Sequence, residues 1–460
     1  MKILVVHQVP YRKIDYHLAI DHEAHDVTYV GRAERLAELP DGLRCRRLEA
    51  GPGDDLAGWI IENVSPGEGF EQLLSLSEDG VLLAWRVRRH LGIEGPSLDR
   101  LRRVRDKVSM KEALEGSGVR HPRFVAADAV PKGGSLPWSG RTVLKPRQGA
   151  SSQEVVIHET AEAALTACRA LGDPAGFELE EYVDGDVLHA DGLVQNGELV
   201  NVVFSRCVRT PLDFAQGTPI ASHQIQHDER HRVFAERVLR ALEIDTGCVH
   251  LEFFETKEQE LVFLEVANRL GGAGIVTSHL RHTGVHLPSH EIAIRLGWPR
   301  PQPQPASGRY HGFAIFPGHH LRPEEGYTVE VPDHIRNHPW VDKVHSLDGR
   351  QPLPDHISYQ EWEIPVFIEA SHPDPGVLRQ ILGEFILAPL VRPGETPTGP
   401  EDPPVNPGGA PAGPGGSSVR PEDTLAGPED TLAGPEDRLA GPEDRLAGSG
   451  GPATGQGGAE

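Results

Sequence analysis

Two apolar segments, Gly247-Cys-Val-His-Leu-Glu-Phe-Phe254 and Leu261-Val-Phe-Leu-Glu-Val-Ala-Asn-Arg-Leu-Gly-Gly272, flank a short polar connection at Thr256–Glu260. Two such runs around a brief polar stretch predict a β-hairpin. If the turn is centred in the middle of this connection, Glu252 and Glu265 fall nearly opposite each other across the ladder. The side chains of such a pair start about 5 Å apart, and like charges at that distance destabilise a sheet.

A divalent cation between Glu252 and Glu265 would remove this penalty, because Mg²⁺ prefers hard carboxylate oxygens together with phosphate oxygens. Asn268 and Arg269 follow directly, and they offer a further oxygen ligand and a planar guanidinium with five donors for an anion. The alternative is a pair of exposed glutamates on an edge hairpin with no ligand. The rest of the chain has to decide between these two interpretations.

The chain of 460 residues is long enough for two or three domains, yet only 38% of it is hydrophobic, which predicts an unstructured part. From Pro397 to Glu460 there is no aromatic residue, and a seven-residue unit, Pro-Glu-Asp-Thr/Arg-Leu-Ala-Gly, recurs four times. A proline in every unit excludes a coiled coil. We therefore expect a disordered acidic Pro/Gly-rich tail over residues 393–460, with a partner-binding tail as the alternative.

The formal net charge of −23 argues against nonspecific nucleic-acid binding, because such binding depends on basic side chains that displace counterions. The four cysteines are scattered without metal-ligand spacing, which indicates reduced thiols. The apolar run at the N-terminus is too short for a signal peptide, and no run reaches membrane-spanning length. We expect a cytoplasmic protein with neither a nucleic-acid partner nor a membrane partner.

Strands alternate with helices over the first 96 residues. Lys2–His7 is typical of a buried parallel strand, Asp26–Gly31 and Cys45–Leu48 predict further strands, and Ala57–Val64 has helical spacing. This alternation predicts an open parallel sheet that binds ligands beyond the carboxyl ends of its strands. Glu78 stands at one such strand end, where we expect it to begin a helix rather than to contact a substrate.

The pattern changes after Gly95-Pro96. Asp106-Lys-Val-Ser-Met-Lys111 predicts the start of a helix, and Val143-Leu-Lys-Pro146 predicts a short strand. The loop Gln148-Gly-Ala-Ser-Ser152 consists of small residues, so its backbone N–H groups can approach phosphates. The loop lacks the Gly-Lys-Ser/Thr of a Walker-type P-loop, and taken alone it also fits a plain hairpin connection.

Together, in this order and spacing, these segments resemble the ATP-grasp superfamily, most of all its carboxylate–amine ligases of the amino-acid or peptide type. The resemblance covers about residues 75–296. It is carried by Ser-Glu-Asp at 77–79, by the helix start at 106–111, by Val-Leu-Lys-Pro with its loop, by Glu-Glu-Tyr-Val-Asp-Gly-Asp at 180–186, and by the hairpin with Glu-Val-Ala-Asn-Arg.

The resemblance implies an α/β fold class with α+β character in the ATP-grasp part. An N-terminal open parallel-sheet domain would span residues 1–96, and a two-lobed ATP-grasp domain residues 97–305. A C-terminal mixed subdomain over 306–392 and the disordered tail would complete the chain. The implied cofactors are ATP and Mg²⁺, or Mn²⁺ in its place.

The nucleotide-binding positions of the superfamily fall on Lys107, Lys145, Ser151, Ser152, Glu180, Glu181, Val183 and Asp186. The resemblance implies that the two lysines face the phosphates and that the two serines lie in the loop that closes over them. The stretch 180–183 matches the hinge that holds adenine, and Asp186 matches the acid on the ribose side.

The resemblance assigns the metal to Glu252, Glu265 and Asn268, and catalysis to Arg269, which faces the reacting carboxylate, together with Lys145. Relatives often read Glu-x-Asn-Pro-Arg, whereas here Ala267 fills the asparagine position. A shift of one residue along a strand turns a side chain to the other face. This departure weakens the metal role of Asn268.

The activity implied by the resemblance is ATP-dependent amide or peptide bond formation through an acyl phosphate, with release of ADP and phosphate. The substrates would be a small carboxylate and an amine of amino-acid size, and the chain could form a homodimer. A biotin-carboxylase-like subunit is the rival enzyme, although the chain lacks a Met-Lys-Met biotin-attachment signature. A degenerate ATP-binding module that regulates a partner is the alternative of a different class.

Overall fold

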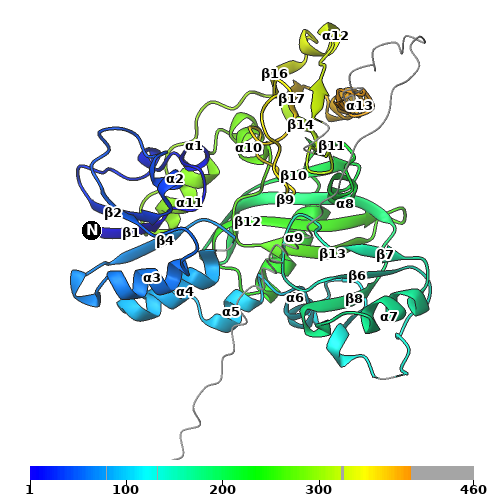
Figure 1. The fold of residues 1–460 in the computed structure, drawn as a ribbon, viewed down its shortest axis with the longest axis horizontal. Helices are drawn as coiled ribbons and strands as arrows, with labels where there is room; N and C mark the ends of the chain where they lie inside the picture. The colour runs from blue at the N-terminus through cyan, green and yellow to red at the C-terminus, as the bar shows by residue number, and fades with distance from the viewer. Residues whose placement is uncertain (79, 132, 323–325, 395–460) are drawn as a thin grey trace, which may run out of the picture. The chain divides into compact units, whose positions relative to one another are not determined.

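The computed structural model describes residues 1–78, 80–131, 133–322 and 326–394. The predicted tail lies outside the described residues, apart from residues 393 and 394. The described part has a parallel sheet and antiparallel sheets with helices against them, which confirms the predicted mixed α/β fold class (Figure 1). Within the described residues, no helix combines the length and the apolar character needed to cross a membrane.

The N-terminal sheet is parallel, as the alternation of strands and helices predicted. Its order is β3-β2-β1-β4, with β1 at Lys2–Val6, β2 at Asp26–Gly31, β3 at Arg46–Glu49 and β4 at Gln72–Ser75. Helices α3 (Leu56–Asn63) and α4 (Gly80–Leu91) bury apolar side chains on one face of this sheet. The short helices α1 (Tyr11–Ile14) and α2 (Ala33–Leu36) connect its strands.

A small antiparallel sheet follows helices α5 (Leu98–Arg102) and α6 (Lys107–Leu114) in the chain. Its order is β5-β8-β6-β7, with β5 at Phe124–Ala126, β6 at Thr142–Pro146, β7 at Val156–His158 and β8 at Phe177–Glu181. Helix α7 (Ala161–Arg169) lies against one face of this sheet (Figure 1). Its Leu165 and Cys168 belong to the same apolar cluster as Leu144 of β6 and Leu179 of β8.

The large sheet has eight antiparallel strands in the order β13-β12-β9-β10-β11-β14-β17-β16. Their bounds are β9 Gly185–Gln195, β10 Glu198–Val208, β11 Ile220–Gln224, β12 Thr246–Thr256, β13 Leu261–Ala267, β14 Tyr310–Phe316, β16 Val341–Ser346 and β17 Val366–His372. The last three strands thus continue the same sheet. The predicted domain boundary between residues 305 and 306 stays a prediction.

Helix α9 (Glu229–Ala241) covers one face of the large sheet and contacts β10 and β13, and its Phe234 and Val238 share a core cluster with Leu251 and Phe253 of β12. The remaining helices are α8 (Pro211–Ala215), α10 (Ile275–Thr283), α11 (Leu287–Arg295), α12 (Asp333–Arg336) and α13 (Pro375–Phe385). A two-stranded sheet joins β15 (Tyr327–Val329) to β18 (Val391–Pro393).

The hairpin of β12 and β13 has the predicted register, because Glu252 pairs with Glu265. Its turn is closed by a bond from the Thr256 amide to the Glu260 carbonyl, and Gln259 takes the left-handed conformation that a tight turn needs. A β-bulge lies between the Glu252 and Phe253 pairs. The bulge supplies the extra residue that brings Glu265, rather than its neighbour, opposite Glu252.

Candidate functional site

A cavity of about 480 Å³ is lined by residues of the small sheet and by residues of the large sheet. Strands β6, β7, β8, β9, β12 and β13, the loop at 148–155 and helices α6 and α8 contribute to its lining. One part of the lining is apolar, with Val143, Ile157, Val187 and Leu264. Its charged part includes Lys107, Lys145, Glu252 and Glu265. This size and this division suit a ligand with a flat apolar end and a charged end.

The structure brings eight of the predicted site residues to the wall of this cavity: Lys107, Lys145, Ser152, Glu180, Glu181, Val183, Glu252 and Glu265. Four others do not contribute to the lining: Ser151, Asp186, Asn268 and Arg269. The nucleotide, metal and catalytic roles of these twelve residues stay predictions.

Each of the paired hairpin carboxylates already has a positively charged neighbour. The Nζ atom of Lys107 lies 3.1 Å from Oε2 of Glu265, and Nε2 of His250 lies 3.2 Å from Oε1 of Glu252. Burial alone would raise the pKa of Glu265, but Lys107 and Lys145 outweigh it and hold that pKa below its usual value. The like-charge penalty expected from the sequence is therefore offset by side chains that lie outside the hairpin.

Lys145 belongs to a buried cluster of two lysines and two glutamates. Its Nζ atom lies 2.6 Å from Oε1 of Glu180, and Nζ of Lys111 lies 2.7 Å from Oε1 of Glu178 and 2.9 Å from Oε2 of Glu180. Burial opposes both charged forms, yet the lysines lower the pKa of Glu180 to about 2 and the glutamates raise the pKa of Lys145. The cluster is neutral as a whole and fixes Lys145 at the cavity wall.

The carboxylates of the predicted adenine hinge are engaged within the protein. Glu180 belongs to the lysine cluster, and Glu181 is held by the guanidinium groups of Arg120 and Arg123. A base placed against this stretch would therefore meet backbone groups and the side chain of Val183. These ion pairs fix the backbone of the hinge.

The loop after β6 has a conformation suited to anions. Gly149, Ser151, Ser152 and Glu154 all have positive φ, between 53° and 125°. Where a left-handed residue adjoins one of ordinary conformation, consecutive N–H groups can turn toward one concave side, a geometry that binds phosphate in other proteins. Lys107 Nζ also donates to the Gly149 carbonyl at 3.3 Å, so this lysine contacts both the loop and Glu265.

Asp186 and Asn268 have other partners in the structure. Alternation along β9 places Asp186 on the face opposite Val187, and its carboxylate pairs with Arg206. Asn268 follows the end of β13, and its Nδ2 donates to the carbonyls of Thr246 and Cys248 at 3.1 and 2.8 Å. Asn268 therefore bonds the backbone of β12, and its metal role stays a prediction.

Arg269 is held by a residue of the N-terminal sheet. The Glu78 carboxylate bridges Arg269 and Arg105, and Nη1 of Arg269 donates to the Leu270 carbonyl at 2.7 Å. Lys13 of α1 lies in the same region, where burial, with Arg269 as a further cause, lowers its pKa to about 8. The expectation that Glu78 only begins a helix is therefore incomplete, because its side chain orients the predicted catalytic arginine.

A network of buried polar side chains adjoins the predicted metal carboxylates Glu252 and Glu265, and the sequence did not reveal it. Asp191 accepts from Nδ1 of His189 at 2.5 Å and from Nδ1 of His250 at 2.8 Å. Nε2 of His189 lies 2.7 Å from Oγ of Ser222. Burial alone would lower the pKa of His250, but Asp191 and Glu252 outweigh it and raise this pKa to about 10.

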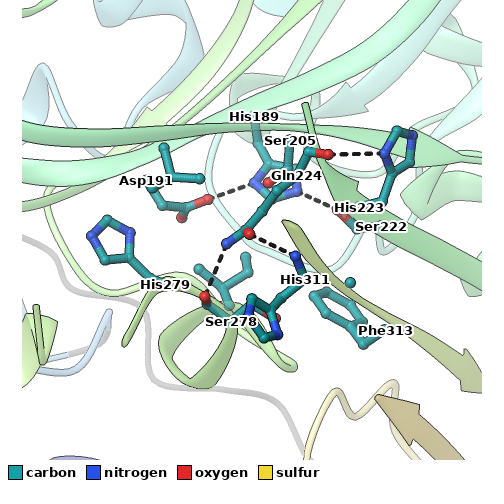
Figure 2. Close-up of a pocket in the computed structure, with 13 residues that line it drawn as sticks. His189, Asp191, Ser205, Ser222, His223, Gln224, Ser278, His279, His311 and Phe313 are labelled. Atoms are coloured by element: carbon teal, nitrogen blue, oxygen red, sulfur yellow. Dashed lines mark hydrogen bonds and ion pairs between the residues drawn. The ribbon is translucent and has the colours of Figure 1, made fainter. Parts of the chain in front are cut away.

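Figure 2 shows where this network ends, at a small polar cavity between the large sheet and α10. His189 and Asp191 line it from β9, and Ser278 and His279 line it from α10. Its volume is about 10 Å³, the size of one water molecule. The side-chain alternation of β9 puts His189 and Asp191 on one face, but only the sheet order shows that this face adjoins Glu252.

No protein-family model matches the chain. Over 223 residues it is 27% identical to an L-arginine-specific L-amino acid ligase of Bacillus subtilis, a match that covers 45% of this chain and 53% of the relative. The chain therefore spans about half the length of this curated relative.

Among solved structures, an L-amino acid ligase from Bacillus licheniformis superposes with a TM-score of 0.60 at 18% identity, over 83% of this chain and 96% of the other. The biotin carboxylase domain of a 2-oxoglutarate carboxylase from Hydrogenobacter thermophilus, solved with MgADP and bicarbonate, gives 0.53 at 16% identity, over 81% and 86%. The resemblance to ATP-grasp ligases is confirmed at the level of the fold.

Proposed function

We propose that the protein is an ATP-dependent ligase that joins a carboxylate to an amine through an acyl phosphate and releases ADP and phosphate. The observation that carries this proposal is the pairing of Glu252 with Glu265 on the wall of the 480 Å³ cavity, with Lys107 and Lys145 beside them. Two hard carboxylates and two phosphate-directed cations at one end of a cavity suit Mg·ATP.

The nucleotide would lie with its base between the apolar side chains and its phosphates at the charged end. Val143, Ile157 and Leu264 offer the apolar surface, and the loop amides near Gly149 with Lys107 and Lys145 offer donors to the phosphates. Glu252 and Glu265 would hold the metal, which when bound neutralises charge on the transferring phosphoryl group.

The first chemical step moves the terminal phosphoryl group of ATP to a carboxylate oxygen of the substrate. The bond between that phosphorus and the bridging oxygen breaks, and ADP leaves with the electron pair. The amine of the second substrate then attacks the acyl carbon, loses a proton and expels phosphate. Lys145 is held in place by Glu180, so it can face phosphate oxygens without first being ordered.

Arg269 would hold the carboxylate substrate for this attack. Its guanidinium plane is fixed by Glu78 at one side and by the Leu270 carbonyl at another, and this arrangement suits positioning of an anion. Lys13 adds a second basic group in the same region. The curated relative acts on L-amino acids, so we expect two amino acids as substrates and a peptide bond as the product.

Incubation of the protein with Mg·ATP and pairs of amino acids tests this function. We expect ADP and phosphate to form only with a productive pair, together with a condensation product by mass spectrometry. ¹⁸O from a labelled carboxylate should appear in the phosphate. AMP and pyrophosphate as products would replace the acyl phosphate with an adenylate.

Glu265→Gln should lower turnover by at least about 100-fold, because it removes a metal carboxylate. Glu258→Gln is the matched control, since it makes the same change at an exposed position of the same hairpin. Equal turnover in the two variants would contradict the metal assignment. ATP binding without turnover for any substrate pair, bicarbonate included, would favour the regulatory-module alternative.

A further inference from the structure

Two adjacent rows of side chains cross β13, β12 and β9 on the cavity face of the large sheet. One row is Glu265, Glu252 and His189, and the next is Ala267, His250 and Asp191. The first row contains both predicted metal carboxylates. In the second row, Ala267 has no donor atom to offer a metal, and the residue directly opposite it is His250. On β12, the side chain next to the predicted metal carboxylates that can bind a metal is therefore the imidazole of His250.

The imidazole of His250 is oriented as metal-binding imidazoles are. Its Nδ1 lies 2.8 Å from Asp191, and its Nε2 points to Oε1 of Glu252 at 3.2 Å. Two donor atoms that share one divalent metal at about 2.1 Å lie about 3.0 to 3.4 Å apart. A histidine ligand usually donates its other ring N–H to a carboxylate, which fixes the tautomer and the ring plane. Asp191 is buried and has that position.

We propose that His250 Nε2 is a ligand of the divalent metal held by Glu252, and that Asp191 is the positioning residue behind it. This inference rests on the proposed nucleotide–metal site. The proton on Nε2 leaves when the metal binds, as it does at any imidazole ligand. Imidazole nitrogen suits transition metals, whereas Mg²⁺ prefers oxygen ligands. The site should therefore favour Mn²⁺ over Mg²⁺ more strongly than an all-oxygen site does.

The geometry also offers a second position for a metal. His189, Asp191 and His250 each offer a ligand atom, and these atoms lie within 4.8 Å of one another. There, however, both Nδ1 atoms already bond the two oxygens of Asp191, and His189 completes its bonding with Ser222. That group is satisfied without a metal and does not line the large cavity, whereas Nε2 of His250 contacts Glu252, which does line it.

Pulsed EPR of the full chain with bound Mn²⁺ and ADP tests the assignment directly. Protein labelled with ¹⁵N only in histidine separates imidazole from the nitrogens of adenine. We expect the hyperfine coupling of one directly bound histidine nitrogen in the parent protein. Bound Mn²⁺ without any histidine coupling would overturn the inference, and this measurement needs no variant.

Variants then identify the histidine. His250→Gln should abolish the coupling and weaken Mn²⁺ binding by about 10- to 100-fold. His189→Gln, a change at the neighbouring imidazole on the same aspartate, should keep the coupling. If His189→Gln abolishes it as well, the metal lies in the His189–Asp191–His250 group instead. Adding Ala267→Asn to His250→Gln supplies an oxygen donor from the opposite strand, and the ratio of Mg²⁺ to Mn²⁺ affinity should then rise.

These outcomes are independent of ligase activity, because metal binding is measured with ADP and without substrates. A histidine coupling in a protein that ligates no substrate pair would uphold the inference and contradict the proposed reaction. Turnover with no histidine coupling would support the proposed reaction and contradict the inference. Asp191→Asn should reduce the affinity for Mn²⁺ more than the affinity for ADP alone, which a purely structural role would not produce.

Discussion

Replacing Lys111 by a neutral residue should be among the most destabilising single changes in the protein, although the sequence pattern assigns this lysine no function. Its side chain has no exposure to solvent, and its ammonium contacts Glu178 at 2.7 Å and Glu180 at 2.9 Å. Lys111→Met keeps the length of the side chain but leaves two buried glutamates with Lys145 alone. Breaking a buried ion pair from one side costs about 3 to 5 kcal/mol, because the remaining charge is uncompensated.

Urea unfolding, together with amide hydrogen exchange in β6 and β8, measures this loss. Lys343→Met is the matched control, because Lys343 contacts Glu361 at a similar 2.8 Å but is 42% exposed. An exposed pair of this kind contributes about 0 to 1 kcal/mol. The difference between the two variants therefore isolates the effect of burial at nearly equal contact distance.

A double variant tests the reason for the loss. Lys111→Met with Glu178→Gln again leaves one buried lysine and one buried glutamate, so it should be more stable than Lys111→Met alone. Each single change unbalances the cluster by one charge, and the pair restores neutrality. If the two single losses simply add, or if Lys111→Met costs no more than Lys343→Met, the charge-balance reasoning is refuted.

Three further outcomes are expected. Glu78→Ala should raise the KM for the carboxylate substrate at least about 10-fold with little change in Mg·ATP binding, because the carboxylate that orients Arg269, and that also pairs with Arg105, is lost; an unchanged KM would contradict this. The pKa of Glu180 is about 2 in the folded protein and higher in the unfolded chain, so its contribution to stability is present above about pH 4.5 and is lost as the pH falls toward 2. Acid unfolding monitored by circular dichroism should show this loss of stability, and the dependence of stability on pH should be weaker in Lys111→Met. Truncation after Pro397 should leave melting temperature and turnover unchanged, since the removed segment lacks aromatic residues, whereas a cut before Val391 should destabilise the chain by removing β18 from β15.

The parts of the fold that depend on local signals could be predicted from the sequence. The register of Glu252 with Glu265 follows from a short turn and from alternation within one hairpin, and both are properties of neighbouring residues. The parallel N-terminal sheet follows in the same way from apolar runs that alternate with helices. The turn at Asn196-Gly197, between β9 and β10, has the left-handed conformations that an Asn-Gly pair favours in a hairpin.

The rest of the site depends on strands that are distant in the chain. β9 lies between β12 and β10, so His189 and Asp191 reach Glu252 and His250 only through pairings across about 60 residues. No local pattern specifies such a neighbour. Glu180 did carry a signal, because it shares one strand face with Glu178, and two acids on a buried face require cations. Identifying Lys111 as one of them still required the packing of α6 on the small sheet.

The ion pairs of the site lead to one more expectation, about how ligands enter it. Glu265 is paired with Lys107, Glu252 with His250, and Glu78 with Arg269. Metal that takes the two hairpin carboxylates leaves Lys107 without its partner, and a phosphate that takes Lys107 leaves Glu265 without its own.

Either ligand alone would therefore leave one charge without its counter-charge, at a cost below that of a fully buried pair because the Glu265 side chain is 32% exposed. When metal and nucleotide bind together, the metal pairs with the hairpin carboxylates and a phosphate pairs with Lys107, so each charge has a partner again. Binding of metal and nucleotide should thus be strongly cooperative, and by linkage each should raise the affinity of the other by the same factor. Calorimetric titrations of ADP with and without Mn²⁺, and of Mn²⁺ with and without ADP, measure the two factors. In Lys107→Met the coupling should shrink, because Glu265 then starts without its counter-charge and the metal alone restores balance.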